Sequence, residues 1–471
     1  MRPAERRFVN PRLERASREE IDAIQLARLH RIVTVAYHRN RFYRALYDKA
    51  GVTPDQIRTL DDFRKRIPFI DKSTFLKDQE DCPPLGARAE ANQDRIAAIV
   101  QTSGTSGVGQ EYHCLAEADA ELWVTSFFYE CRWAGIEPGD RVVRFTRIGM
   151  EAGGLWHKAA GERYGLTQFA LQPYDTPTRL KIMQRVSPNL IMTQPSYLTR
   201  LVFACEEAGI VPREAFPQVK AIMLAGEAHG GAEWVRHMEA TWGAPIMEWF
   251  GSTQAGGSHM FSCEGGLYFD DGRPRMLHNL DHRIYFEALD VETGEPVGPG
   301  EYGEALLTNL FNENFPVIRF RSRDRVRFLP AGYCDCGRPF HGIESGSVSR
   351  VDDMIKIRGQ NVWPSAIDAA VFQHLQVEEY QGRVWLDETG RERVDLRVEF
   401  RSGAGGKAER GAMLDAIASA IKARTDISMV CQEAEAGSLP RFDQKSRRWK
   451  DERREGRAGL AGQREDRPLH A

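Results

Sequence analysis

Short apolar runs alternate with stretches of helical periodicity along much of this chain, and this alternation most limits how the chain can fold. Each run is rich in aliphatic residues and bounded by polar or turn-forming residues, which is typical of a buried strand. Strands that alternate with helices favour an α/β layered domain. The runs are 96–100, 141–145, 190–193, 219–224 and 244–249.

The two ends of the chain differ from this middle part. Residues 17–46 carry apolar positions at helical spacing, which predicts a helical lead-in. Residues 284–290 and 303–308 read as antiparallel partner strands, because a turn-rich segment joins them. Beyond a boundary near Arg350, strand and helix patterns predict a compact α+β unit. The expected parts are a large layered N-terminal domain, 1–349, a small α+β domain, 350–453, and a polar, disordered tail, 454–471.

Composition limits the class of partner. The 471 residues carry 64 Lys and Arg against 67 Asp and Glu, a formal net charge of −3. This balance creates no field that attracts nucleic acid or anionic lipid, so small molecules are the expected partners. The charged N-terminus, Met1–Arg7, and the lack of a long uncharged apolar run predict a cytoplasmic protein without a membrane span. Five scattered cysteines read as small core residues: Cys82, Cys114, Cys131, Cys205 and Cys431.

A segment of glycines and small hydroxyl residues follows the run 96–100. A buried strand that leads into such a segment can present backbone N–H groups and hydroxyls to phosphate oxygens. The segment lacks the Gly-Lys-Ser/Thr ending of a Walker A motif, which disfavours a P-loop NTPase. On its own it is more often a solvated turn, so other parts of the chain must decide. The segment is Thr102-Ser103-Gly104-Thr105-Ser106-Gly107.

Further motifs follow in a fixed order. They are Ala225–Glu227, Phe250–Gln254, Arg321–Asp324, Arg350–Gly359 and Pro440–Lys445, with additional likenesses at Gly153–Leu155, Pro195–Tyr197 and Arg358–Ser365. Together with 102–107, this order resembles the adenylate-forming superfamily, most closely its phenylacetate-CoA ligase branch. The resemblance covers most of residues 20–450. It implies a large adenylation domain followed by a small, mobile C-terminal domain.

The resemblance also implies a two-step reaction. A carboxylate attacks the α-phosphate of ATP to give an acyl adenylate and pyrophosphate, and the thiol of coenzyme A (CoA) then displaces AMP. Charge develops on phosphate oxygens in the first step, and the resemblance assigns Lys445 and Thr105 to stabilise it. The nucleotide contacts that it implies are Thr102, Ser103, Gly104, Thr105, Ser106, Gly107, Glu227, Phe250, Gly251, Ser252, Thr253, Asp324 and Arg350.

Four of these carried-over residues have separate physical roles. Phe250 would stack on adenine, Asp324 would accept hydrogen bonds from the ribose hydroxyls, and Arg350 would help hold the nucleotide. Asp352 resembles the hinge residue at which the C-terminal domain rotates between the two steps. Without the resemblance, Phe250 reads as a core aromatic, Asp324 and Arg350 as partners in surface ion pairs, and Lys445 as a solvated residue.

Two positions depart from the family pattern. Gln254 stands where the family usually has a glutamate that helps hold Mg²⁺, and an uncharged amide oxygen is a weaker ligand for a hard dication. Val108 stands where the phenylacetate branch often has a lysine. These changes are compatible with lower turnover, with Mg²⁺ held by other oxygens, or with a non-catalytic relative.

Clustered cysteines and a histidine suggest a metal site. His259 and Cys263 follow the 250–254 motif, and Cys334 and Cys336 follow Asp324, so the fold would bring two nucleotide-site loops together. Three thiolates and one imidazole suit a closed, structural, tetrahedral Zn²⁺ site. Ordinary reduced cysteines are the alternative.

The leading hypothesis is therefore an AMP-forming acid–CoA ligase that uses ATP, Mg²⁺ and CoA. An aromatic acid is expected, by resemblance and because Phe145, Trp156 and Trp249 flank the motifs, although these side chains could equally be core residues. One alternative keeps adenylation and changes the acceptor to an amine or a carrier thiol, or activates nitrite for an aryl amine. Another is a nucleotide-binding protein without catalysis. The sequence does not fix the oligomeric state, and a homodimer is one option.

Overall fold

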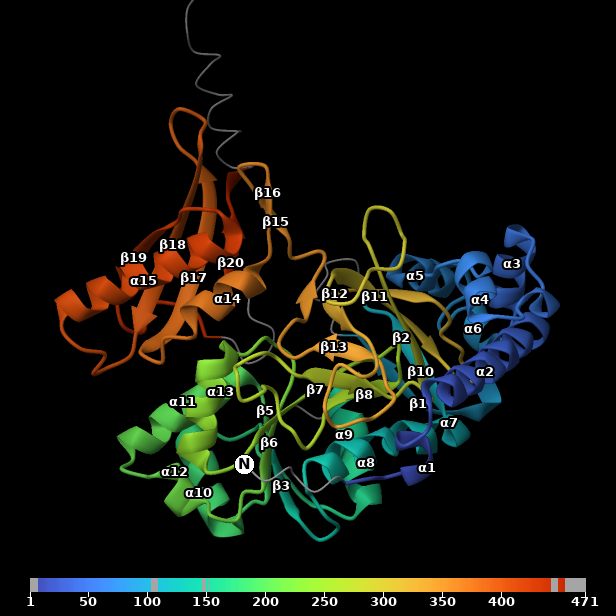
Figure 1. The fold of residues 1–471 in the computed structure, drawn as a ribbon, viewed down its shortest axis with the longest axis horizontal. Coiled ribbons are helices and arrows are strands. Elements are labelled where there is room, and N and C mark those ends of the chain that lie inside the picture. The colour runs from blue at the N-terminus through green and yellow to red at the C-terminus, as the bar shows by residue number, and fades with distance from the viewer. Residues whose placement is uncertain (1–6, 103–108, 146–149, 151, 442–447, 454–471) are drawn as a thin grey trace, which may run out of the picture. The chain divides into compact units, whose positions relative to one another are not determined.

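The computed structural model describes residues 7–102, 109–145, 150, 152–441 and 448–453. The chain forms two compact units (Figure 1): the first is Met1–Gly226 with Met238–Val348, and the second is Glu227–His237 with Ser349–Ala471. The tail predicted to be disordered, 454–471, lies outside the described residues. Among the described helices, none combines the length and the apolar character that crossing a bilayer requires.

The predicted helical lead-in is present at the start of the first unit. Its longest helix, α2 (Arg18–Arg39), begins at Ser17, whose hydroxyl accepts from the Glu20 N–H while the Glu20 carboxylate accepts from the Ser17 N–H. Asn40 ends α2 and caps the next helix. The other helices of this part are α1 (Pro11–Glu14), α3 (Arg41–Ala50), α4 (Leu60–Arg66), α5 (Lys72–Asp81) and α6 (Ala87–Glu90), with short 3₁₀ turns at Pro54–Gln56 and Gln93–Arg95.

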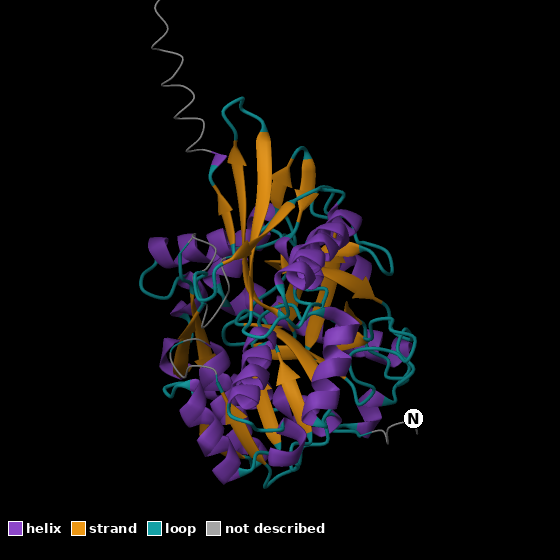
Figure 2. Ribbon diagram, turned by 90° about the vertical axis from the view of Figure 1, so that its left-hand side faces the viewer, coloured by secondary structure: helices purple, strands orange, loops and turns teal. Residues whose placement is uncertain are grey.

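Four of the predicted strands, together with β4, which was not predicted, form the parallel part of the main sheet, as the α/β alternation predicts. Its order is β4-β3-β5-β6-β7, with all neighbours parallel. Figure 2 shows helices flanking these strands. The strands are β3 (Arg141–Arg144), β4 (Thr167–Ala170), β5 (Leu190–Thr193), β6 (Ala221–Leu224) and β7 (Ile246–Ser252). The helices are α7 (Glu117–Val124), α8 (Ser126–Trp133), α9 (Ala152–Tyr164), α10 (Thr176–Val186), α11 (Pro195–Glu207), α12 (Pro212–Ala215) and α13 (Gly231–Trp242).

The first predicted strand is not a buried strand of this sheet. β1 (Ile96–Gln101) pairs antiparallel with β2 (Tyr112–Ala116) in a separate two-stranded sheet. Val100 is fully buried, but Ile99 is 36% exposed. The run 96–100 is uniformly apolar and hides this alternation, so the expectation of burial was wrong for one face of the strand.

An antiparallel section extends the main sheet beyond β7. The predicted hairpin is confirmed, because Ile284 pairs with Asn309 and Leu289 with Glu304. Its strands, β10 and β11, lie at the far edge, in the order β10-β11-β12-β13-β9-β8-β7. The strands are β8 (Gly257–Ser262), β9 (Met276–Asn279), β10 (Ile284–Leu289), β11 (Tyr302–Asn309), β12 (Phe320–Leu329) and β13 (Gly342–Glu344).

The second unit is an α+β fold, as predicted. Its four-stranded sheet has the order β19-β18-β17-β20, and two helices, α14 and α15, share an apolar core with it. The elements are β14 (Ser349–Arg350), the hairpin β15 (Ile355–Ile357) and β16 (Gln360–Val362), α14 (Pro364–Val371), β17 (Val377–Leu386), β18 (Glu392–Phe400), α15 (Lys407–Thr425), β19 (Val430–Ala434) and β20 (Trp449–Asp451).

Candidate nucleotide and metal sites

The predicted phosphate-binding segment begins at a tightly held stem. The N–H of Thr102 donates to the carbonyl oxygen of Glu111 at 3.1 Å, and the Thr102 hydroxyl accepts from the N–H of Glu111 at 3.2 Å. These two bonds fix both ends of the connection between β1 and β2. The other predicted residues of this segment, Ser103, Gly104, Thr105, Ser106 and Gly107, lie outside the described residues, as do Val108 and Lys445.

Gln254 lies in the turn between β7 and β8 and reaches the stem of this segment. Its Nε2 donates to Oε1 of Glu111. Glu111 has an exposed fraction of 0%, and its Oε2 is buried without a hydrogen-bond partner among the described residues. His113 Nε2 lies 3.5 Å from Glu111 Oε1, and burial lowers the pKa of His113 although Glu111 opposes that shift. The structure therefore brings the Phe250–Gln254 motif to the stem formed by Thr102 and Glu111, where the predicted phosphate-binding segment begins.

The remaining residues of this motif shape the turn. A Cβ on Gly251 would lie 2.3 Å from the carbonyl oxygen of Gly257, so the close approach of β7 and β8 requires glycine there. The Ser252 hydroxyl accepts from the N–H of Ala255 at 3.1 Å, and the Thr253 carbonyl oxygen accepts from the N–H of Gly256 at 3.1 Å. These contacts hold Gln254 in place.

Phe250 and Asp324 both adjoin His259. The Phe250 ring is 9% exposed and meets the His259 imidazole edge to face, with centroids 5.6 Å apart. Asp324 lies on β12, and its charge acts on His259, although burial is the larger influence and lowers the pKa of His259 to about 4. The side chains predicted for adenine and ribose are thus neighbours of one neutral imidazole.

Three predicted residues belong to the second unit. Glu227 falls in its first segment. Arg350 Nη2 lies 3.6 Å from Asp352 Oδ2, and the side chains are 29% and 40% exposed. This pair has the geometry of a surface ion pair, the alternative that the sequence left open for Arg350.

Three cysteines and one histidine form a compact cluster. The ligand atoms of Cys263, His278, Cys334 and Cys336 all lie within 4.8 Å of one another, and all four residues are buried. The Sγ atoms of Cys263 and Cys334 are 3.8 Å apart, and Cys336 Sγ lies 3.4 Å from His278 Nε2. A tetrahedral Zn²⁺ with bonds of about 2.3 Å to sulfur and 2.0 Å to nitrogen separates its ligands by roughly 3.8 and 3.5 Å. The cluster therefore has the dimensions of a zinc site.

His259 is not the fourth member of this cluster, which corrects the predicted ligand set. Its Nδ1 instead pairs with Asn279 Oδ1 at 3.0 Å. His259 lies on β8 and Cys263 directly follows that strand, and four residues of extended chain span about 13 Å, too far for one ion. His278 on β9 pairs across the sheet with Phe261, which brings it beside Cys263.

Charged side chains surround the cluster and tie it to neighbouring segments. Arg338 pairs with Glu14 at 3.1 Å and with Glu264 at 2.8 Å, and all three side chains are buried. Arg275 Nη1 lies 3.7 Å from Cys334 Sγ. Hydrogen bonds from Cys263 and Cys334, together with the nearby imidazole of His278, lower the pKa of Cys336. These surroundings favour the thiolate of Cys336, the form of cysteine that binds zinc, whereas hydrogen bonds with Cys334 and Cys336 raise the pKa of Cys263.

Sequence reasoning missed three residues of interest. Glu111 follows the phosphate segment, and only the β1–β2 pairing reveals that it stands opposite Thr102. His278 required the register of β8 and β9. Arg144, at the carboxyl end of β3, is 3% exposed, and its Nε and Nη1 are buried without hydrogen-bond partners in the described part of the chain. A signal existed for Arg144, since a charged residue within a run of valines is unusual for a buried strand.

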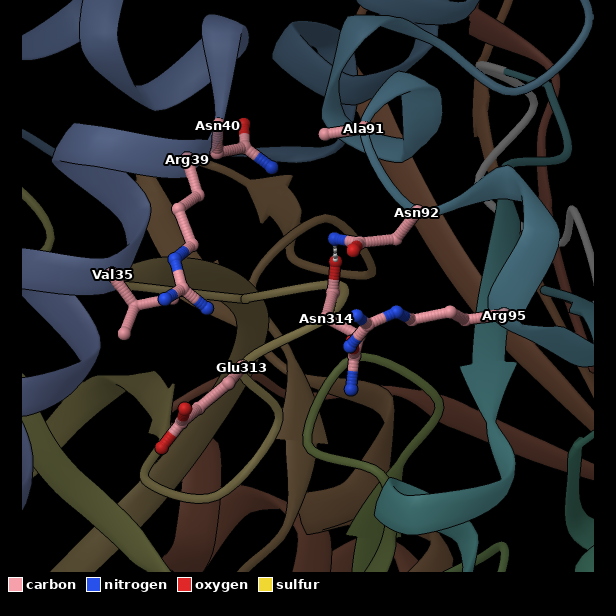
Figure 3. Close-up of a pocket in the computed structure, with 8 residues that line it drawn as sticks. All are labelled: Val35, Arg39, Asn40, Ala91, Asn92, Arg95, Glu313 and Asn314. Atoms are coloured by element: carbon pink, nitrogen blue, oxygen red, sulfur yellow. Dashed lines mark hydrogen bonds between the residues drawn. The ribbon is translucent and has the colours of Figure 1, made fainter.

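A surface pocket lies elsewhere in the first unit. It encloses about 410 Å³ between α2, the segment after α6 and the segment before β12 (Figure 3). Asn92 Nδ2 donates to the Asn314 carbonyl oxygen at 2.9 Å across it. Its lining residues include none of the predicted nucleotide or metal residues: Val35, Arg39, Asn40, Ala91, Asn92, Arg95, Glu313 and Asn314.

Comparisons with known proteins identify the family of this chain. Residues 12–309 match the family model of the AMP-binding enzyme, and residues 359–453 match that of the AMP-binding enzyme C-terminal domain. Phenylacetate-coenzyme A ligase of Pseudomonas putida is 28% identical over 94% of this chain and 96% of the relative. Its counterpart in Escherichia coli strain K12 is 29% identical over 92% and 95%.

Solved structures show the same fold. 2-Hydroxyisobutyryl-CoA ligase, bound to an acyl adenylate in its postadenylation state, matches with a TM-score of 0.86 at 24% identity and covers 99% of this chain and 97% of its own. Anthranilate CoA ligase with anthranoyl-AMP matches with a TM-score of 0.58 at 16% identity, over 82% and 74%. The family models account for most of the sequence, and the chain belongs to the AMP-binding, adenylate-forming enzymes.

Proposed function

We propose that this chain is an ATP-dependent acid–CoA ligase that forms AMP. One observation carries the proposal: Gln254 of the β7–β8 turn bonds to Glu111 at the stem of the phosphate segment, so two motifs far apart in sequence meet where ATP would bind. The relatives named as CoA ligases, matched over nearly the whole chain, support it. The order of the two family domains supports it as well.

The chemistry follows from the two leaving groups. A carboxylate oxygen attacks the α-phosphorus of ATP, the bond to the bridging oxygen breaks, and pyrophosphate leaves. The CoA thiol, after losing its proton, then attacks the acyl carbonyl, and AMP leaves. The charge that develops on the phosphate oxygens in the first step would be stabilised by the segment 102–107, which includes Thr105, and by Lys445. Asp352 would be the hinge at which the C-terminal domain rotates before the second step. Mg²⁺ would accompany the phosphates.

We propose an aromatic acid as substrate. The resemblance to phenylacetate-CoA ligases supports this. Phe145, which directly follows β3, also supports it, because its ring centroid lies 4.9 Å from that of Tyr197 on α11. Trp156 contributes less, because it is 2% exposed and its indole N–H donates to the Trp123 carbonyl oxygen, as expected of a core residue. Trp249 is half-buried against His157.

The test is an AMP-release screen of aromatic and aliphatic acids, each with and without CoA. A ligase releases AMP with pyrophosphate and forms a thioester only when CoA is present. AMP release with an acid that yields a different product without CoA would favour another acceptor. ATP binding without AMP release from any acid would refute the proposal in favour of a non-catalytic relative.

We also propose that Cys263, His278, Cys334 and Cys336 bind one structural Zn²⁺. The four side chains supply a closed tetrahedral set, which leaves no position for a reactive water. The ion would hold β8 and β9 to the loop that follows β12. A cytoplasmic location suits such a thiolate site, because that compartment keeps cysteines reduced.

A further inference from the structure

We propose that Glu111 supplies the carboxylate that binds the Mg²⁺ of ATP, in place of the glutamate that Gln254 replaces. The inference rests on the proposed ATP-dependent function and assigns a metal ligand within it. It also resolves the departure at position 254, since the negative charge would be present near that position but supplied by the residue that precedes β2.

Glu111 is a buried carboxylate with capacity to spare. Its side chain is inaccessible to solvent, its Oε1 accepts one hydrogen bond from Gln254, and its Oε2 has none among the described residues. A buried carboxylate normally has several donors or a paired cation, because removing it from water is costly. Oε2 is therefore an oxygen atom that could bind a cation.

Among the described residues, the basic side chain beside this carboxylate is a histidine. The nearest basic atom is His113 Nε2, 3.5 Å from Oε1. In the part of the chain that the structure describes, no lysine or arginine pairs with Glu111.

The position of Glu111 fits an ion that travels with phosphates. Its backbone pairs with Thr102, the first residue of the segment 102–107 that the resemblance assigns to phosphate binding. Mg²⁺ in such sites takes one or two carboxylates, substrate phosphate oxygens and water. Gln254 Nε2 donates to this carboxylate, so the two side chains are direct neighbours and a charge at either position would lie beside the same ion.

The experiment exchanges the charge between the two positions. Binding of Mn²⁺, a spectroscopic stand-in for Mg²⁺, is measured by electron paramagnetic resonance with a non-hydrolysable ATP analogue. Glu111→Gln is expected to weaken Mn²⁺ binding roughly tenfold or more, the scale of losses seen when even outer-shell partners of metal ligands are removed. Adding Gln254→Glu to that variant is expected to restore it.

Glu130→Gln is the matched control. Glu130 on α8 is 4% exposed, and both of its carboxyl oxygens are buried without partners among the described residues, so this variant makes the same carboxyl-to-amide change away from the motifs. This variant should bind Mn²⁺ as the unaltered protein does. Thermal melts of all variants separate loss of metal from loss of fold.

Two results would overturn the inference. Unchanged Mn²⁺ affinity in Glu111→Gln would make Glu111 a structural residue while leaving the ligase proposal intact. Equal weakening in Glu111→Gln and in the double variant would show that charge at this place is not what binds the ion. A protein that binds neither Mn²⁺ with nucleotide nor ATP would instead overturn the proposed function itself.

Discussion

Replacing Cys336 by serine is expected to release the proposed zinc ion and destabilise the first unit. The ion would join Cys263 after β8, His278 on β9 and two cysteines of the loop after β12. A serine hydroxyl is a far poorer zinc ligand than a thiolate, so three ligands remain. The loop keeps other anchors, including Arg338 with Glu14 and Glu264, and we expect local loosening rather than global unfolding.

The size of the effect follows from ligand linkage. An ion that binds only the folded cluster stabilises it by about 4 kcal/mol when free zinc exceeds the dissociation constant a thousandfold. Rearranging the ligands costs little of this binding free energy, because the Cys263–Cys334 separation of 3.8 Å and the Cys336–His278 separation of 3.4 Å already match a tetrahedral site. For a unit of this size, at most about 2 °C accompanies each kcal/mol, so the melting midpoint should fall by up to about 8 °C.

The assay combines metal analysis with thermal melts of the full chain. Unaltered protein should contain close to one zinc per chain and Cys336→Ser almost none, and a chelator should lower the midpoint of the unaltered protein but not that of Cys336→Ser. Cys205→Ser, at another fully buried cysteine, is the control for the cost of a buried hydroxyl and should keep its zinc. Zinc retained by His278→Gln but lost from His259→Gln would refute the ligand set argued from the structure.

Three further predictions test single residues. Lys445→Ala should slow ATP–pyrophosphate exchange about a hundredfold or more, as loss of one charge-stabilising group typically does, and an unchanged rate would contradict its assignment. Arg144→Met should raise the free energy of unfolding in denaturant melts by about 1 kcal/mol or more, because the buried Nε and Nη1 of Arg144 have no described partner. Burial lowers the pKa of His259 to about 4, against roughly 6.5 when unfolded. The stability that this shift contributes is complete above pH 6.5 and is lost as the pH falls to 4, by about 3 kcal/mol, so unfolding of His259→Gln should depend less steeply on pH across this window.

The sequence predicted secondary structure correctly where the residues of a strand or of its adjoining turn were sufficient evidence. The runs 141–145, 190–193, 219–224 and 244–249 became β3, β5, β6 and β7, because strands buried on both faces need continuous apolar residues. The hairpin of β10 and β11 followed from the turn between them. The run 96–100 has the same composition, yet it forms a half-exposed hairpin, because what covers a strand is decided by the rest of the fold.

The residues of the candidate sites were harder to predict from the sequence than the strands, because they depend on which strands become neighbours. Spacing along the chain paired His259 with Cys263, but the side chain that reaches Cys263 is His278, which the register of β8 and β9 brings alongside. Gln254 read as the loss of a metal ligand, and the stem formed by Thr102 and Glu111 places a carboxylate against it. A missing charge in a motif is therefore weak grounds for inferring lost chemistry until the neighbouring strands are known. What matters for an oxygen ligand is its position, and here the segment before β2 and the β7–β8 turn bring two side chains together.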